Sequence, residues 1–186
     1  LRVLRETVTV KLNLELACDN DVLDLALETK PHQATLVPER REEVTTEGGL
    51  DVVAAKSKVR DAISRLHDAG IIVSLFLDPD RAAIDMAKSL GGDAVELHTG
   101  QYALADGAEQ AAQLQKLVDA GRRIIEQGMT LHAGHGLTYR NVQPVARIPH
   151  MGELNIGHSI VARALMVGFQ AAVREMKDLI DADLRP

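Results

Sequence analysis

Strand-like and helix-like segments alternate six times along this chain of 186 residues. Each short apolar run is followed by a longer segment that has the three-to-four-residue spacing of an amphipathic helix. The predicted strands are Lys11–Leu16, Gln33–Pro38, Ile71–Asp78, Ala94–Gly100, Met129–Gly134 and Glu153–Gly157. The predicted helices are Asn20–Thr29, Val52–Ala69, Arg81–Leu90, Gly107–Gln127, a short one near Asn141–Ala146 and a long final one from Ser159 to about Asp183. Because strands joined through helices must lie parallel, this order predicts an α/β fold with a parallel sheet.

Alternation inside the predicted strands favours a barrel over an open sheet. In Lys11–Leu16 three leucines alternate with a lysine, an asparagine and a glutamate, and Glu96 lies between Val95 and Leu97. One face of each strand would therefore pack on helices, whereas the other face is polar and points into a shared interior. Central strands of an open parallel sheet are apolar on both faces. The pattern predicts a TIM (β/α)8 barrel.

The length agrees with six of the eight units of such a barrel. The fold has about 250 residues, or about 31 per unit, so 186 residues should hold about six units. The opening segment Leu1–Arg5 has the spacing of a helix and no initiator methionine precedes it. We therefore predict a single (β/α)-barrel domain over residues 1–186, with the first two units belonging before Leu1.

Charge and cysteine content narrow the classes of function. The net charge is −6 and the basic residues are scattered, which argues against a nucleic-acid partner. The single cysteine, Cys18, fits a reducing compartment. No apolar stretch approaches the roughly 18 residues of a membrane span. These features predict a cytoplasmic protein without a membrane partner.

Two glycine–histidine segments, Ala133–Gly136 and Asn155–His158, each follow a predicted strand and precede a predicted helix. Glycines at such turns let backbone N–H groups close on an anion, and a helix N-terminus adds partial positive charge. Ser159 is a suitable N-cap for the last helix. Two such turns in consecutive units indicate an enzyme acting on a small phosphorylated metabolite.

Seven short segments together carry a resemblance to a known family. They are Asn13–Glu15, Lys30–His32, Leu36–Glu39, Val44–Asp51, Glu96–Gly100, Ala133–Tyr139 and Glu153–His158. In this order the chain resembles the pyridoxine 5'-phosphate synthase family of vitamin B6 biosynthesis, essentially from Leu1 to the final helix. The asparagine, aspartate and histidine of the family's first strand, and the arginine-rich second strand with its catalytic histidine, have no match in the sequence.

The resemblance implies a condensation of 3-amino-2-oxopropyl phosphate with 1-deoxy-D-xylulose 5-phosphate. The products would be pyridoxine 5'-phosphate, inorganic phosphate and water. The resemblance also implies that no redox cofactor or metal takes part, and that the protein is a homo-octamer built from dimers. Several proton transfers are needed, so the site must contain groups that accept and donate protons.

Three residues carry over as catalytic. By resemblance Glu15 is a proton acceptor, His135 a proton donor and Glu96 a transition-state stabiliser. An inward-facing, partly desolvated carboxylate and an imidazole near neutral pH suit such roles. From the residues alone, Glu15 could equally be an interior partner of a lysine or arginine, and His135 a structural hydrogen-bonding group. Glu96 could be a buried partner of His98 or an interior base.

Four residues carry over as substrate-binding. Gly136, Gly157 and His158 match residues that bind the amino-ketone phosphate, and Thr45 matches one that contacts the deoxyxylulose phosphate. The polar, glycine-ended run Arg40–Leu50 is longer than an ordinary turn, which fits either a lid that excludes water or a plain solvated loop.

Other functions stay open at this point. Four histidines with two glutamates could surround a metal at the barrel mouth, but no ligand spacing indicates it, and we predict no metal; these are His98, His132, His135, His158, Glu15 and Glu96. Another phosphate-binding barrel enzyme, such as an aldolase or isomerase, is the main alternative. A Schiff-base aldolase would need an inward lysine, and Lys11 lies at the wrong end of its strand. A binding or assembly module without catalysis is the other alternative.

Overall fold

The computed structural model describes residues 1–38 and 48–182. Its six strands are β1 Asn13–Leu16, β2 Gln33–Leu36, β3 Ile72–Leu77, β4 Ala94–His98, β5 Thr130–Gly134 and β6 Met151–Asn155. Its helices are α1 Arg2–Thr7, α2 Asn20–Thr29, α3 Lys56–Asp68, α4 Arg81–Leu90, α5 Gly100–Leu104, α6 Gly107–Glu126, α7 Val142–Ala146, α8 His158–Val167 and α9 Phe169–Asp181. Within these ranges, the predicted alternation of strands and helices is confirmed.

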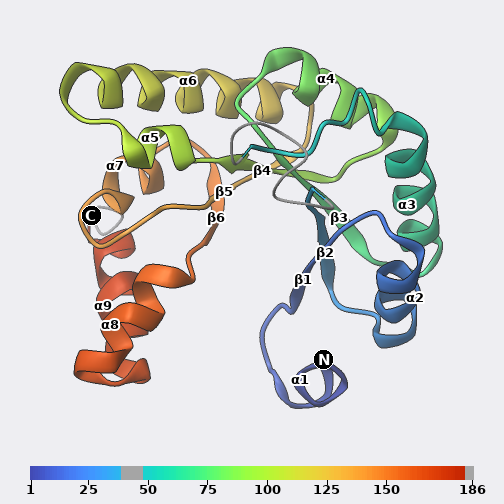
Figure 1. Cartoon of the computed structure of the whole chain (residues 1–186), viewed down its shortest axis with the longest axis horizontal. Helices are drawn as coiled ribbons and strands as arrows, with labels where there is room; N and C mark the ends of the chain where they lie inside the picture. The colour runs from blue at the N-terminus through green and yellow to red at the C-terminus, as the bar shows by residue number, and fades with distance from the viewer. Residues whose placement is uncertain (39–47, 183–186) are drawn as a thin grey trace.

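The six strands form one parallel sheet in the order of the chain, from β1 to β6. Figure 1 shows this sheet curled into a half-barrel, with α2, α3, α4 and α6 on its convex side. The predicted TIM-barrel class of α/β fold is therefore confirmed, with six strands in the described part of the chain. The carboxyl ends of all six strands lie at the same edge of the sheet, because neighbouring strands are parallel.

The convex face of the sheet carries the hydrophobic core. Outward-facing strand residues such as Leu36, Leu75 and Leu97 have no exposed side-chain surface. Ile84 on α4 and Ile124 on α6 belong to the same buried cluster. Burying such side chains contributes about 1.5–3 kcal/mol each, which holds the helices against the sheet.

The concave face is polar, as the alternation predicts. Thr35, Ser74, Glu96 and His132 point into the interior and are buried. The register places Thr35 beside Ser74 and Glu96 beside His132, so polar side chains lie next to each other on neighbouring strands. Buried polar groups of this kind are costly unless paired, which makes the interior the place to look for function.

The last helical region differs from the prediction of one long helix. It breaks at Gly168, whose φ of 84° lies in the left-handed region, into α8 and α9, which pack against each other. The expected N-cap role of Ser159 is also wrong, because Gly157 occupies the N-cap position and α8 begins at His158. The hydroxyl of Ser159 instead donates to the Leu137 carbonyl at 2.8 Å.

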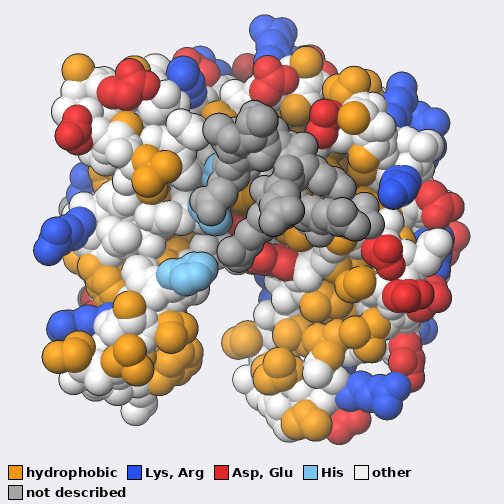
Figure 2. All heavy atoms as spheres, viewed as in Figure 1, with side chains coloured by type: hydrophobic (Ala, Val, Ile, Leu, Met, Phe, Trp, Pro, Cys, Tyr) orange, Lys and Arg blue, Asp and Glu red, His pale blue; other side chains and the backbone are white. Residues whose placement is uncertain are grey.

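Hydrophobic side chains remain exposed near both ends of the sheet. Val3 and Leu4 on α1, and Leu165 and Met166 on α8, are more than half exposed. Figure 2 shows hydrophobic side chains on two lobes that face each other across a gap, one of them formed by α8 and α9. No helix in the described ranges is long and apolar enough to cross a membrane.

Candidate active site

The predicted catalytic residues lie at the carboxyl-terminal edge of the sheet. Glu15 is on β1, Glu96 is on β4 and His135 directly follows β5. The predicted phosphate-binding pair Gly157 and His158 follows β6. Thr45, with most of the predicted lid, lies outside the described residues.

Glu96 is the most strongly perturbed ionisable group of this edge. Its side chain is only 3% exposed, and burial raises the pKa of Glu96 from the ordinary 4.5 to about 8. The nearby Glu15 carboxylate adds to the increase, whereas a hydrogen bond from Asn155 Nδ2 to Glu96 Oε2, 2.7 Å long, opposes it. Glu96 therefore holds a proton at neutral pH. The alternative in which Glu96 is a buried partner of His98 is not observed, because Glu96 accepts from Asn155 and His98 contacts Asp78.

A glycine makes room for the Glu96 carboxyl group. A Cβ atom on Gly134 would lie 2.3 Å from Glu96 Oε1 and 3.0 Å from the carbonyl oxygen of Asn155. Contacts this short are not tolerated, so any side chain at position 134 would displace Glu96 or β6. Gly134 is thus needed to leave space for the Glu96 carboxyl group, in addition to its part in the turn.

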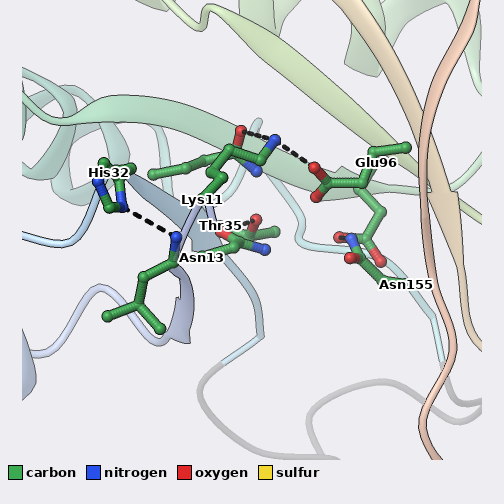
Figure 3. A network of polar contacts seen from close by, with 9 residues as sticks. Lys11, Asn13, His32, Thr35, Glu96 and Asn155 are labelled. Atoms are coloured by element: carbon green, nitrogen blue, oxygen red, sulfur yellow. Dashed lines mark hydrogen bonds and ion pairs between the residues drawn. The ribbon is translucent and has the colours of Figure 1, made fainter. Parts of the chain in front are cut away.

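Glu15 faces the same interior from the opposite end of the sheet. It lies in register with Thr35 and is exposed, so the expected desolvation of this carboxylate is not observed. Among the described residues β1 pairs with β2 alone, which leaves the Glu15 side chain open to solvent. Figure 3 shows Lys11 and Thr35 on this side of the interior, with Glu96 and Asn155 across from them. Glu15 is close enough to Glu96 to influence its ionisation.

His135 is held in a sharp turn at the end of β5. Its φ of 77° and that of Gly136, 79°, both lie in the left-handed region, which is costly for a residue with a side chain. The hydroxyl of Thr99 contacts the carbonyls of Gly134 and His135 at 2.8 and 2.5 Å and fixes this turn. The imidazole of His135 is exposed at the mouth of the half-barrel.

The sequence did not indicate the aspartate–histidine contact that lies beside this turn. His98 at the end of β4 contacts Asp78 with its Nδ1 atom, 2.8 Å from Asp78 Oδ1. The hydrogen bond with His98 lowers the pKa of Asp78, against an opposing effect of burial. The rings of His98 and His135 meet edge to face with centroids 4.9 Å apart. Asp78 and His98 lie twenty residues apart, so only the β3–β4 register brings them together.

The two predicted phosphate turns lie side by side. The Ser159–Leu137 hydrogen bond connects them, and Gly134 pairs with Asn155 in the sheet. Gly157 has open space around the position of a Cβ atom, and both Gly157 and His158 are exposed. Because α7 begins only at Val142, no helix N-terminus directly follows the first turn, contrary to expectation.

Further polar groups lie in the interior on the amino-terminal side of Glu96. Lys11 Nζ donates to Gln33 Oε1 at 3.1 Å and forms an ion pair with Glu153. Burial lowers the pKa of His132, which lies in register with Glu153. Among the described residues, no group of three or more His, Cys, Asp or Glu side chains is arranged to hold a metal ion.

The half-barrel and its polar edge define the class of the protein: a TIM-barrel protein whose candidate functional groups lie at the carboxyl ends of its strands. The family described as "Pyridoxal phosphate biosynthesis protein PdxJ" matches residues 1–182. The chain belongs to this family.

Known relatives agree with this assignment, and a solved structure agrees with the fold. "Pyridoxine 5'-phosphate synthase" of Rhodopirellula baltica is 57% identical over 177 residues, which are 95% of this chain and 72% of the relative. The protein of the same name from Magnetococcus marinus is 52% identical over 96% of this chain and 74% of the relative. The tryptophan synthase α-subunit from Pyrococcus furiosus has the same fold, with a TM-score of 0.62 at 15% identity over 96% of this chain and 68% of that chain.

Proposed function

We propose that this protein is a pyridoxine 5'-phosphate synthase that condenses 3-amino-2-oxopropyl phosphate with 1-deoxy-D-xylulose 5-phosphate. Family membership and the names of its relatives support the reaction. The observation that carries the proposal is a pair of carboxyl groups in opposite environments. Glu15 is exposed, whereas Glu96 is buried with a pKa of about 8. Such differences between neighbouring carboxyl groups are typical of acid–base sites.

Each of the three groups suits one kind of proton transfer. Glu15 would accept protons from substrate carbon atoms at the open mouth of the half-barrel. Glu96 holds its proton in the free protein. Beside a developing iminium or ammonium charge it would release this proton to water at the open mouth, and the resulting carboxylate would stabilise the positive charge. His135 would donate a proton to a leaving group, since an imidazole can bind and release a proton near neutral pH.

The phosphate of the amino-ketone substrate would bind at Gly136, Gly157 and His158. The two turns lie side by side, and the N-terminus of the ten-residue helix α8 begins at His158. Backbone N–H groups at a helix N-terminus favour an anion, and the open space at Gly157 allows one to approach. Thr45 would contact the phosphate of the second substrate, as the resemblance implies.

The aldolase alternative finds less support. A Schiff-base mechanism needs a lysine whose amine reaches the carboxyl-terminal edge of the sheet. Lys11 precedes β1 at the amino-terminal edge, and its ammonium group contacts Gln33 and Glu153. We therefore place the synthase reaction first.

Product formation from both phosphorylated substrates tests the proposal. The purified protein is mixed with the two substrates, and pyridoxine 5'-phosphate is followed by its fluorescence. We expect turnover by the wild type and a loss of about 10²- to 10⁴-fold in kcat for Glu15→Gln, because general base catalysis contributes about this much. Glu6→Gln on the exposed helix α1 is the matched control and should keep wild-type turnover. A folded, complete wild-type protein, with the units predicted before Leu1 present, that shows no turnover would reject the synthase reaction and favour another phosphate-binding barrel enzyme.

The octameric assembly implied by the resemblance stays a prediction. The exposed apolar residues Val161, Leu165 and Met166 on α8 are consistent with an interface between copies. Light scattering on the purified protein gives the number of copies, and a monomer would contradict the prediction.

A further inference from the structure

We propose that Asp78 and His98 form a positioning pair that fixes the imidazole of His135 in the orientation needed for proton transfer. The inference rests on the proposed function, in which His135 donates a proton. It assigns a role to two residues for which neither the motifs nor the resemblance indicates one. Asp78 follows β3 and His98 ends β4, so neighbouring strands present them at the carboxyl-terminal edge.

The orientation of the His98 ring is determined on two sides. Its side chain is buried, and its Nδ1 atom lies 2.8 Å from Asp78 Oδ1. On the opposite side, a Cβ atom on Gly100 would lie 2.5 Å from His98 Nε2, so the ring uses the space that only a glycine leaves. A ring confined in this way has one rotamer and can support a neighbour.

Asp78 also determines which nitrogen of His98 carries a hydrogen. Its second oxygen, Oδ2, accepts a hydrogen bond from the backbone N–H of Gly49 at 3.1 Å. The lowered pKa of Asp78 keeps this carboxylate ionised, so both oxygens are acceptors. His98 must then donate from Nδ1, which leaves Nε2 as the unprotonated nitrogen of the neutral ring.

His98 in turn contacts the side chain of His135. The two rings meet edge to face with centroids 4.9 Å apart, and Phe76 lies against both, 5.1 Å from His98 and 6.3 Å from His135. The backbone of His135 is fixed by Thr99, but its imidazole is exposed at the mouth. The contact with His98 therefore restricts a side chain that faces solvent, and orientation of a reacting group is worth about 10²-fold in rate.

A second aspartate that contacts both a histidine and a backbone N–H, here with one oxygen for both contacts, lies far from the carboxyl-terminal edge. Asp93 Oδ2 accepts from the backbone N–H of Val73 at 2.8 Å and contacts His67 Nε2 at 2.7 Å. Asp93 precedes β4, so this second pair lies at the amino-terminal edge of the sheet. It has the same two residue types as the Asp78 pair and no contact with the described candidate site residues, which makes it a control for an Asp→Asn substitution.

The kinetic test compares Asp78→Asn with Asp93→Asn. An asparagine has one acceptor oxygen where two donors converge, so Asp78→Asn forces His98 to change its tautomer or lose its contact. We expect kcat to fall about ten- to hundredfold while KM for both substrates stays near the wild-type value, because the substitution leaves the predicted phosphate turns intact. Asp93→Asn should keep wild-type kcat. Equal kcat values for both variants would overturn the proposal.

A second readout does not depend on turnover. In protein labelled with ¹⁵N-histidine, two-bond ¹H–¹⁵N correlations report the tautomer of each ring, assigned by single substitution of each histidine. We expect His98 to carry its hydrogen on Nδ1 and to show nuclear Overhauser effects to His135 in the wild type, with these effects weakened in Asp78→Asn. A rotating His135 ring without such contacts in the wild type would overturn the positioning role. If the contacts between the His98 and His135 rings are observed but neither the complete wild type nor a variant forms product, the proposed reaction is wrong, whereas the arrangement of the two rings is still supported.

Discussion

The two edges of the sheet use similar residues with opposite energetic consequences. At the amino-terminal edge, Asp93 bonds an exposed histidine and a backbone N–H, which is favourable for folding. At the carboxyl-terminal edge, Glu96 is buried with a pKa of about 8, and His135 takes a left-handed backbone conformation. A buried, protonated carboxyl group and a strained histidine thus lie where the predicted chemistry takes place. The difference indicates that the carboxyl-terminal edge is arranged for reactivity and the amino-terminal edge for stability.

The largest expected effect follows from replacing the strained histidine. His135→Gly removes the proposed proton donor, so kcat should fall about 10²- to 10⁴-fold. Stability should change by less than about 1 kcal/mol, because glycine relieves the left-handed strain while ring contacts with His98 are lost. Steady-state kinetics and urea unfolding measure the two quantities. Turnover within a few-fold of the wild type would remove His135 from the catalytic residues.

Lys30→Gly is the control at the other edge. Lys30 ends α2 with a φ of 51° and directly precedes the segment that leads into β2. A glycine is favoured at such a helix end, so stability should rise by up to about 1 kcal/mol. Turnover should not change. A loss of turnover in Lys30→Gly would show that the amino-terminal edge also contributes to the reaction, which would contradict the difference between the two edges.

The next effect concerns the glycine beside Glu96. Gly134→Ala places a methyl group 2.3 Å from Glu96 Oε1, which displaces the carboxyl group. We expect kcat to fall about 10²-fold, as for other small displacements of reacting groups, and stability to fall by about 1–3 kcal/mol.

Gly152→Ala near the start of β6 is a control for Gly134→Ala. Its Cβ atom would lie no closer than 3.2 Å to a neighbour, so a small shift accommodates it. Steady-state kinetics and thermal unfolding of both variants measure kcat and stability. Wild-type kcat in Gly134→Ala would mean that the position of the Glu96 carboxyl group is not critical.

The last effect, which concerns stability and not turnover, is a pH dependence. The pKa of Glu96 in the folded protein lies above the ordinary 4.5. Between pH 4.5 and about 8 the folded protein therefore keeps a proton that the unfolded chain has already released. The stability from this group is full below pH 4.5 and is lost as the pH rises through this window, by at most about 1.4 kcal/mol per pH unit.

Glu96→Gln removes this dependence, since a carboxamide does not ionise. Relative to the wild type, the variant should therefore gain stability as the pH rises from 4.5 to 8. Urea unfolding across this range measures the difference, and Glu6→Gln on the exposed α1 should follow the wild type. Parallel stability curves for wild type and Glu96→Gln would show that Glu96 is ionised in the folded protein at neutral pH.

The repeating features of the fold were predictable from the sequence. Alternation in Lys11–Leu16 and around Glu96 indicated a polar concave face, and the helices α2 and α4 have the predicted bounds. Such features depend on the spacing of apolar residues, which can be read from a short stretch of sequence. The break of the last helix at Gly168 was missed, because one glycine inside an apolar pattern does not by itself end a helix.

The environment of each candidate residue was less predictable than its location. The resemblance selected Glu15, Glu96 and His135, and the fold brings them to one edge. The exposure of Glu15 and the Asn155 hydrogen bond to Glu96 depend on the sheet register and on which strands are neighbours. The Asp78–His98 contact likewise arises between strands, so no motif could indicate it.

The sequential order of the strands also has a consequence for how the chain folds. In the described sheet each strand pairs with its neighbour along the chain, so the sheet can grow from any starting unit by closing one helical crossover at a time. The ion pair of Lys11 with Glu153 is different, because it joins the approach to β1 with β6. That contact forms only when the strands from β1 to β6 have come together, so it follows the pairing of neighbouring strands.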